Sequence, residues 1–167
     1  RELKEQRKMA TVLNMLGGLM HDQGDYEPSA EFLAESLQLW RELGDKQGLA
    51  TALNNLGAVA QAKGEYKQAW ELHQESLSLK RQLNYRRGIA YSLSNLGEVA
   101  LCLNNHEQAE KLQMESLEIM QELGDKWGTA IVCNNLGQIA QQQDDDKCAL
   151  YWYQRSLVIY REIANIP

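Results

Sequence analysis

The side chains best suited to acid–base or metal chemistry are few, and no motif organises them. His21, His73 and His106 lie in unrelated surroundings, and the chain has no HExxH, P-loop, GxSxG or paired Cys–His spacing. Those spacings accompany zinc, nucleotide and nucleophilic-serine chemistry, which need several groups held together. We therefore predict no catalytic residues, no enzyme activity, no metal site and no cofactor.

Two further sets of residues invite a chemical interpretation. Asp144, Asp145 and Asp146 could hold a cation, but an EF-hand loop needs alternating oxygen ligands and a Glu at its twelfth position. The run lacks both, so a solvated turn is favoured. A platform for single-stranded nucleic acid would need aromatic residues in register. The tryptophans stand at unrelated positions and indicate local packing: Trp40, Trp70, Trp127 and Trp152.

Asparagine is the polar residue whose recurrence asks for a reason. It occurs at Asn14, Asn54, Asn55, Asn95, Asn134 and Asn135, in segments that are otherwise typical of helices, where asparagine is unfavourable. A side-chain amide both donates and accepts hydrogen bonds, so a row of amides can bind the backbone of an extended peptide. The alternative is that these amides bridge neighbouring helices.

Composition excludes several classes of partner. The 167 residues carry 17 basic and 23 acidic side chains, a net charge of −6, which disfavours nucleic acid and anionic membranes. No apolar run approaches the length that spans a bilayer, and no signal peptide is visible at the start. Three cysteines without a CxxC pair favour reduced thiols, so the predicted location is cytoplasmic.

The elements that would position the amides repeat every 40 residues. Leu16-Gly17 recurs at 56–57, 96–97 and 136–137, with no insertion between the copies. Because such a period indicates stacked units, we predict a single array over 1–167. Its units are 4–43, 44–83, 84–123 and 124–163, and residues 1–3 match the end of a preceding unit.

Each unit is predicted to be a pair of helices. Apolar residues at helical spacing are interrupted once within each unit by a residue type that tolerates the left-handed conformation: Gly24, Gly64, Asn104 and Asp144. Gly44, Asn84 and Gly124 do the same between units, and Asp45 and Asp125 follow as candidate N-caps.

A helical wheel assigns faces to the first helix of each pair. Apolar and small residues cover about half of the circumference, so this helix must pack against its own partner and against the next unit. Gly17 and its equivalents are expected to let the second helix approach, opposite a small residue at Ser29, Ala69, Ala109 or Ala149. The free side carries the candidate binding residues Asn54, Asn55, Tyr91, Asn95, Glu98, Asn134, Asn135 and Gln138.

Together these features resemble the tetratricopeptide repeat over essentially the whole chain. They are Leu-Gly in the first helix, the turns Gly24-Asp25-Tyr26 and Gly64-Glu65-Tyr66, and the small residue in the second helix. The usual unit is about 34 residues long, so this chain resembles the longer subclass of the family. The resemblance implies an all-α fold, a right-handed superhelix of four helix-turn-helix repeats, whose concave groove binds a protein or an extended peptide.

The alternative function is a structural one. The array would be either a self-associating spacer that joins end to end with other copies, or a regulatory arm of a larger signalling enzyme. The resemblance implies that this enzyme would be a nucleotide-switch ATPase or a caspase-like protease. Relatives that clamp acidic C-terminal tails carry Lys and Arg in the groove. None stands at the candidate positions, which disfavours such a tail.

Overall fold

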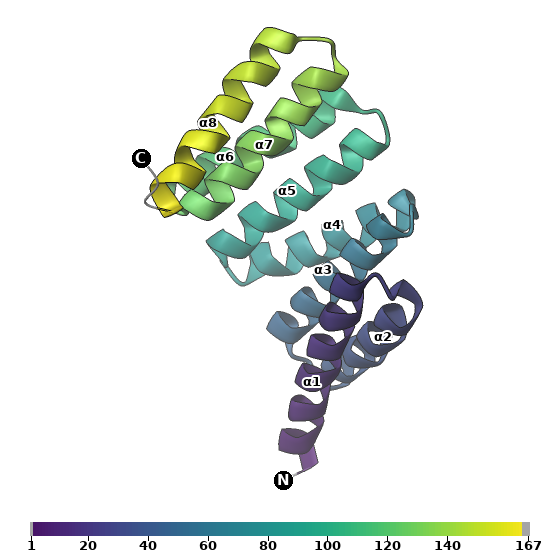
Figure 1. Cartoon of the computed structure of the whole chain (residues 1–167). Coiled ribbons are helices and arrows are strands. Elements are labelled where there is room, and N and C mark those ends of the chain that lie inside the picture. Colours follow the sequence, from purple (N-terminus) through teal and green to yellow (C-terminus); the bar gives the residue numbers. More distant parts are fainter. Residues whose placement is uncertain (1, 165–167) are drawn as a thin grey trace. The chain divides into compact units, whose positions relative to one another are not determined.

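The chain folds into two compact units, Arg1–Tyr85 (unit 1) and Arg86–Pro167 (unit 2). The structure is a computed structural model that describes residues 2–164, which form eight helices and no strand (Figure 1). Unit 1 contains α1 (Glu2–Gln23), α2 (Tyr26–Glu42), α3 (Lys46–Ala62) and α4 (Tyr66–Gln82). Unit 2 contains α5 (Arg86–Cys102), α6 (His106–Glu122), α7 (Lys126–Gln142) and α8 (Asp146–Ala164). Residue 1, part of the predicted remnant 1–3, lies outside the described residues.

Helices pack in pairs, and the pairs stack within each unit. In unit 1, α1 packs on α2 and α3 packs on α4, while α2 also contacts α3. Unit 2 repeats the arrangement with α5 on α6, α7 on α8, and α6 against α7. The predicted all-α fold of helix-turn-helix repeats is therefore confirmed.

The turns have the backbone conformation that their residue types predict. Asn104 and Asp144 have positive φ angles of 58° and 59° at the turn within the pair, where glycine occupies the other two repeats. After the turn between pairs, the Asp45 side chain accepts hydrogen bonds from the backbone N–H groups of Gln47 and Gly48, and Asp125 accepts one from Gly128. Both predicted N-caps are confirmed.

Close approach within each pair depends on the glycine of the Leu-Gly motif. A Cβ added to Gly17 would lie 2.5 Å from Cγ of Leu33 on α2, too close for any real contact. The same glycine faces His73, Gln113 or Tyr153 in the other pairs. The small residues predicted opposite it, Ser29, Ala69, Ala109 and Ala149, are all buried. One serine on the second helix of each pair also donates its hydroxyl hydrogen to a first-helix carbonyl at 2.7–2.8 Å: Ser36, Ser76, Ser116 and Ser156.

Candidate functional site

The candidate binding residues lie on the first helices of the pairs. Asn54 and Asn55 lie on α3 of unit 1, and the other six lie on α5 and α7 of unit 2: Tyr91, Asn95, Glu98, Asn134, Asn135 and Gln138. We call the side of the first helices that carries Asn14 and Asn55 the amide face of unit 1. The side that carries Asn95 and Asn135 is the amide face of unit 2.

In unit 2 a polar network ties α5, α6 and α7 together. The Asn135 amide donates to Oε1 of Glu98 at 2.8 Å and to Oγ of Ser94 at 3.3 Å. Gln113 of α6 donates to the Ser94 carbonyl at 2.9 Å and accepts from its hydroxyl at 3.1 Å. These contacts leave Asn135 only 6% exposed, so it bridges helices, as the alternative interpretation of the amides proposed.

Unit 1 has the matching bridge between its own first helices. The Asn55 amide donates to Oδ1 of Asn14 at 3.3 Å, across the same separation of 41 residues that joins Asn135 to Ser94. Oδ1 of Asn54 instead accepts from the Lys80 ammonium at 3.0 Å. Recurrence of the bridge in both units shows that it belongs to the stacking of repeats.

The remaining candidates lie elsewhere on α5 and α7. The Tyr91 hydroxyl lies 3.4 Å from Oδ2 of Asp125, a long contact. Asn95 and Asn134 are half-buried, and Gln138 is exposed. The binding role predicted for these residues stays a prediction, and Gln113 is a buried polar partner that the sequence analysis missed.

A pocket of about 260 Å³ opens between α1 and α3 at the amide face of unit 1. Its lining combines the Trp40 indole with hydroxyl, amide and carboxylate groups: Thr11, Asn14, Trp40, Asp45, Gln47, Gly48 and Thr51. The two threonine hydroxyls donate to carbonyls one turn earlier, so their oxygens still present lone pairs. The NH₂ group of Asn14 has no partner among the described residues, which leaves it available to a ligand carbonyl.

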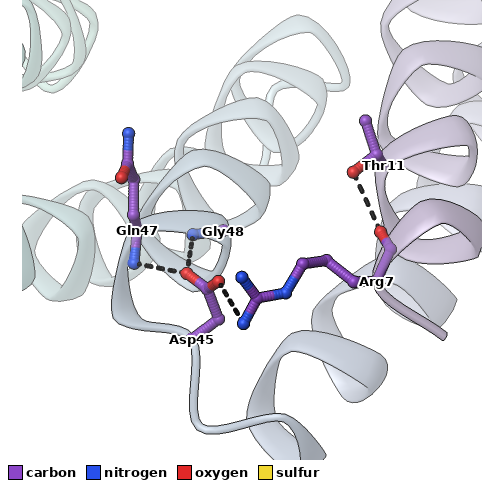
Figure 2. A network of polar contacts seen from close by, with 5 residues as sticks. All are labelled: Arg7, Thr11, Asp45, Gln47 and Gly48. Atoms are coloured by element: carbon purple, nitrogen blue, oxygen red, sulfur yellow. Dashed lines mark hydrogen bonds and ion pairs between the residues drawn. The ribbon is translucent and has the colours of Figure 1, made fainter. Parts of the chain in front are cut away.

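One of the residues that line this pocket, Asp45, also forms an ion pair. Oδ1 of Asp45 caps α3, while Oδ2 pairs with the Arg7 guanidinium of α1 at 3.3 Å (Figure 2). In unit 2, Asp125 caps α7 and pairs with Arg87 of α5 at 3.2 Å. One carboxylate thus both starts a helix and ties it to the first helix of the preceding pair. The caps were predicted from the sequence, but their arginine partners were not.

Replacing Asp45 with alanine is expected to lower the free energy of unfolding by about 1 kcal/mol, mainly through loss of the cap. Asp45→Asn keeps a good capping oxygen and loses only a partly exposed ion pair, so it should remain within about 0.5 kcal/mol of wild type. Urea unfolding followed by circular dichroism separates the two results. Equal losses in both variants would show that the ion pair, not the cap, carries the effect.

The comparisons identify the family. The family model described as Tetratricopeptide repeat matches residues 8–82 and 88–162, which is most of the chain. This protein therefore belongs to the tetratricopeptide repeat family. A comparison with curated proteins finds no match.

Solved structures of the same fold extend the comparison. BtubC (BKLC) from P. vanneervenii is 23% identical, with a TM-score of 0.79 over 96% of this chain and 70% of its own. Apo RapI is 17% identical, with a TM-score of 0.85 over 95% of this chain. A Rap protein complexed with Competence and Sporulation Factor is 15% identical, with a TM-score of 0.82 over 97% of this chain. This chain spans 58% of RapI and 44% of that Rap protein.

The side chains and helices of residues 2–164 bear on two other kinds of site, a metal site and a membrane span. Within them, no three His, Cys, Asp or Glu side chains come together as a set that could hold a metal ion. None of the helices formed by these residues is both long and apolar enough to cross a membrane.

Proposed function

We propose that this protein is a non-catalytic scaffold that binds a partner protein through an extended segment laid along the amide face of unit 1. The observation that carries the proposal is the pocket of unit 1 between α1 and α3. Its Trp40 indole offers an apolar wall for one side chain of the segment, and the Asn14 NH₂ group offers a donor for a backbone carbonyl. The pocket volume of about 260 Å³ suits a single side chain rather than a large cofactor.

The bridging amides support the same surface in a second way. Asn55 and Asn135 hold successive first helices together, which fixes the spacing between neighbouring binding positions. A preorganised surface loses less entropy when it binds a flexible segment. Another protein with this fold also binds a partner, since a Rap protein forms a complex with Competence and Sporulation Factor.

The experiment begins by selecting peptides from a displayed random library against the whole chain and measuring the affinity of a retained peptide. Thr51→Arg places a long side chain in the pocket from an exposed position on α3 and is expected to weaken binding at least about tenfold. Asn14→Ala removes the free donor and is expected to weaken binding about fivefold.

Ser78→Arg, which adds the same charge at an exposed position on α4, is the matched control and should bind as wild type does. Thermal melting of each variant confirms that the fold is intact. The proposal is wrong if no peptide motif emerges from the selection, or if Thr51→Arg binds the selected peptide with wild-type affinity.

A further inference from the structure

The pocket of unit 1 presents mainly hydrogen-bond acceptors to a guest. The Thr11 hydroxyl already donates its hydrogen to the Arg7 carbonyl at 2.9 Å. The Thr51 hydroxyl does the same to the Gln47 carbonyl at 3.0 Å, so both threonine oxygens can only accept a further hydrogen bond. Oδ1 of Asn14 accepts one side-chain hydrogen bond, at 3.3 Å, and keeps a second lone pair. A side chain that satisfies these oxygens must be rich in donors.

The lining also carries charge of one sign. Among the described residues that line the pocket, Asp45 is the only one with a charged side chain. Its Oδ1 accepts from the backbone N–H groups of Gln47 and Gly48, and its Oδ2 pairs with Arg7. A carboxylate has about four lone-pair sites, so Asp45 has room for a further donor. Because hydrogen bonds between opposite charges are the strongest, a donor that is also a cation is favoured there.

The cation that Asp45 now holds is easily displaced. Figure 2 shows the Arg7 side chain reaching from α1 to the carboxylate. The Arg7 side chain is 60% exposed, and an ion pair with so exposed a partner contributes little to stability. Arg7 can therefore turn into the solvent and leave Oδ2 of Asp45 to the cation of a ligand.

The indole of Trp40 adds an apolar wall to the acceptors. Trp40 lines the pocket and is held in one apolar cluster with Leu37 and Leu53, so the wall is fixed before a ligand arrives. A long basic side chain packs its methylene stem against an apolar surface while its charged head reaches a polar group. Short polar side chains supply neither the stem nor the charge.

We infer that the pocket of unit 1 binds an arginine side chain of the partner segment, with its stem against Trp40 and its guanidinium on Asp45 in place of Arg7. The inference rests on the proposed function and deepens it, because it makes the partner a basic segment. Arginine is favoured over lysine, since a planar guanidinium has five donors for the carboxylate and the threonine oxygens, whereas an ammonium has three. The net charge of −6 also favours the approach of a basic segment.

The first experiment tests the pocket without a selected peptide. The whole chain is titrated with N-acetyl-arginine methylamide, and binding is followed through the indole N–H signal of Trp40 in NMR spectra. The citrulline analogue has nearly the same shape but no charge, so it should bind at least about tenfold more weakly. The lysine analogue should bind about threefold more weakly than the arginine analogue.

Three variants locate the preference for arginine over citrulline. Asp45→Asn keeps a capping oxygen, and it should reduce the preference to about twofold or less. Arg7→Gln removes the competing cation and should tighten binding of the arginine analogue about threefold. Glu31→Gln removes the same charge as Asp45→Asn from an exposed position on α2, and it should leave the preference unchanged.

The second experiment repeats the comparison with peptides retained from the displayed library. These peptides should share an arginine, and citrulline in its place should weaken binding about tenfold in wild type but not in Asp45→Asn. A shared motif without arginine overturns this inference and leaves the proposed function standing. If no motif emerges but the arginine analogue is still preferred, the arginine site stands and the extended segment does not. Equal binding of the arginine and citrulline analogues, or an unchanged preference in Asp45→Asn, overturns the inference whatever the selection yields.

Discussion

Lowering the pH from 7 to below 4 is expected to remove about 3 kcal/mol of unfolding free energy through His73 alone. His73 is fully buried on α4 against Gly57, and neither ring nitrogen has a hydrogen-bond partner among the described residues. Burial, with a smaller contribution from the nearby Lys80 charge, lowers the pKa of His73 from 6.5 to about 4. The folded protein therefore holds this ring in its neutral form.

The direction of this pH dependence follows from the proton uptake of the folded and unfolded chains. Between pH 6.5 and about 4 the unfolded chain protonates His73 while the folded chain does not, so protons favour unfolding. The full stability is present above pH 6.5, falls as the pH drops through this window, and levels off once the folded state also binds the proton. Carboxylates titrate in the same region, so the contribution of His73 needs a variant that removes it.

His73→Leu supplies that variant, since Leu33 fills the equivalent position of the first pair and is fully buried there. The variant should be more stable at pH 7 by about 1–2 kcal/mol, because two unpaired nitrogens leave the core. Its advantage over wild type should then widen by about 3 kcal/mol between pH 7 and pH 4. Urea unfolding at several pH values measures both differences.

His21→Leu is the control, because it replaces a partly exposed histidine of α1. It should keep the steep acid loss of wild type. A difference between wild type and His73→Leu that does not change with pH would show that the ring is accessible to protons in the folded state.

The fold could be predicted from the sequence because each constraint appears several times. Gly17 and its three equivalents, and the small residue opposite each, show a close helix contact by recurrence alone. The turns are shown by recurrence in the same way. Asn104 and Asp144 stand where the other repeats have glycine, and all of these positions have a left-handed backbone. Repetition turns a weak local preference into a strong pattern.

The partners of individual polar side chains could not be predicted in the same way. A helical wheel places Asn135 on the side opposite the packed arc, but it cannot show that Glu98 and Ser94 reach across from α5 and bury it. Arg7 and Asp45 are 38 residues apart, and only the crossing of α1 and α3 brings them together. Leu33, His73 and Gln113 share one repeat position, and all three are buried. The change from an apolar to a polar residue at this position is visible in the sequence, but it was not used to predict a buried polar group.

Gly48→Ala is expected to destabilise unit 1 by about 2–3 kcal/mol, whereas the same substitution at Gly128 should cost less than about 1 kcal/mol. The two glycines share one repeat position, so helix propensity and distance from the N-cap are matched. The difference lies in what each new methyl group would meet on the preceding helix. Gly48 faces the Trp40 ring, with three ring carbons within 2.6 Å of the added Cβ.

Trp40 has little freedom to move away. It is 7% exposed and belongs to the apolar cluster with Leu37, Ala52 and Leu53, so its ring can shift only by disturbing that cluster. Gly128 faces the sulfur and terminal methyl group of Met120, at 2.5 and 2.9 Å from the added Cβ. Met120 is fully buried as well, but these atoms end a flexible side chain, which shifts at less cost than a fused ring does. Urea unfolding of Gly48→Ala, Gly128→Ala and the rescue variant Gly48→Ala with Trp40→Met tests this. Recovery of stability by Trp40→Met in the Gly48→Ala background would locate the cost in the ring, and equal losses at both glycines would instead place it in the backbone.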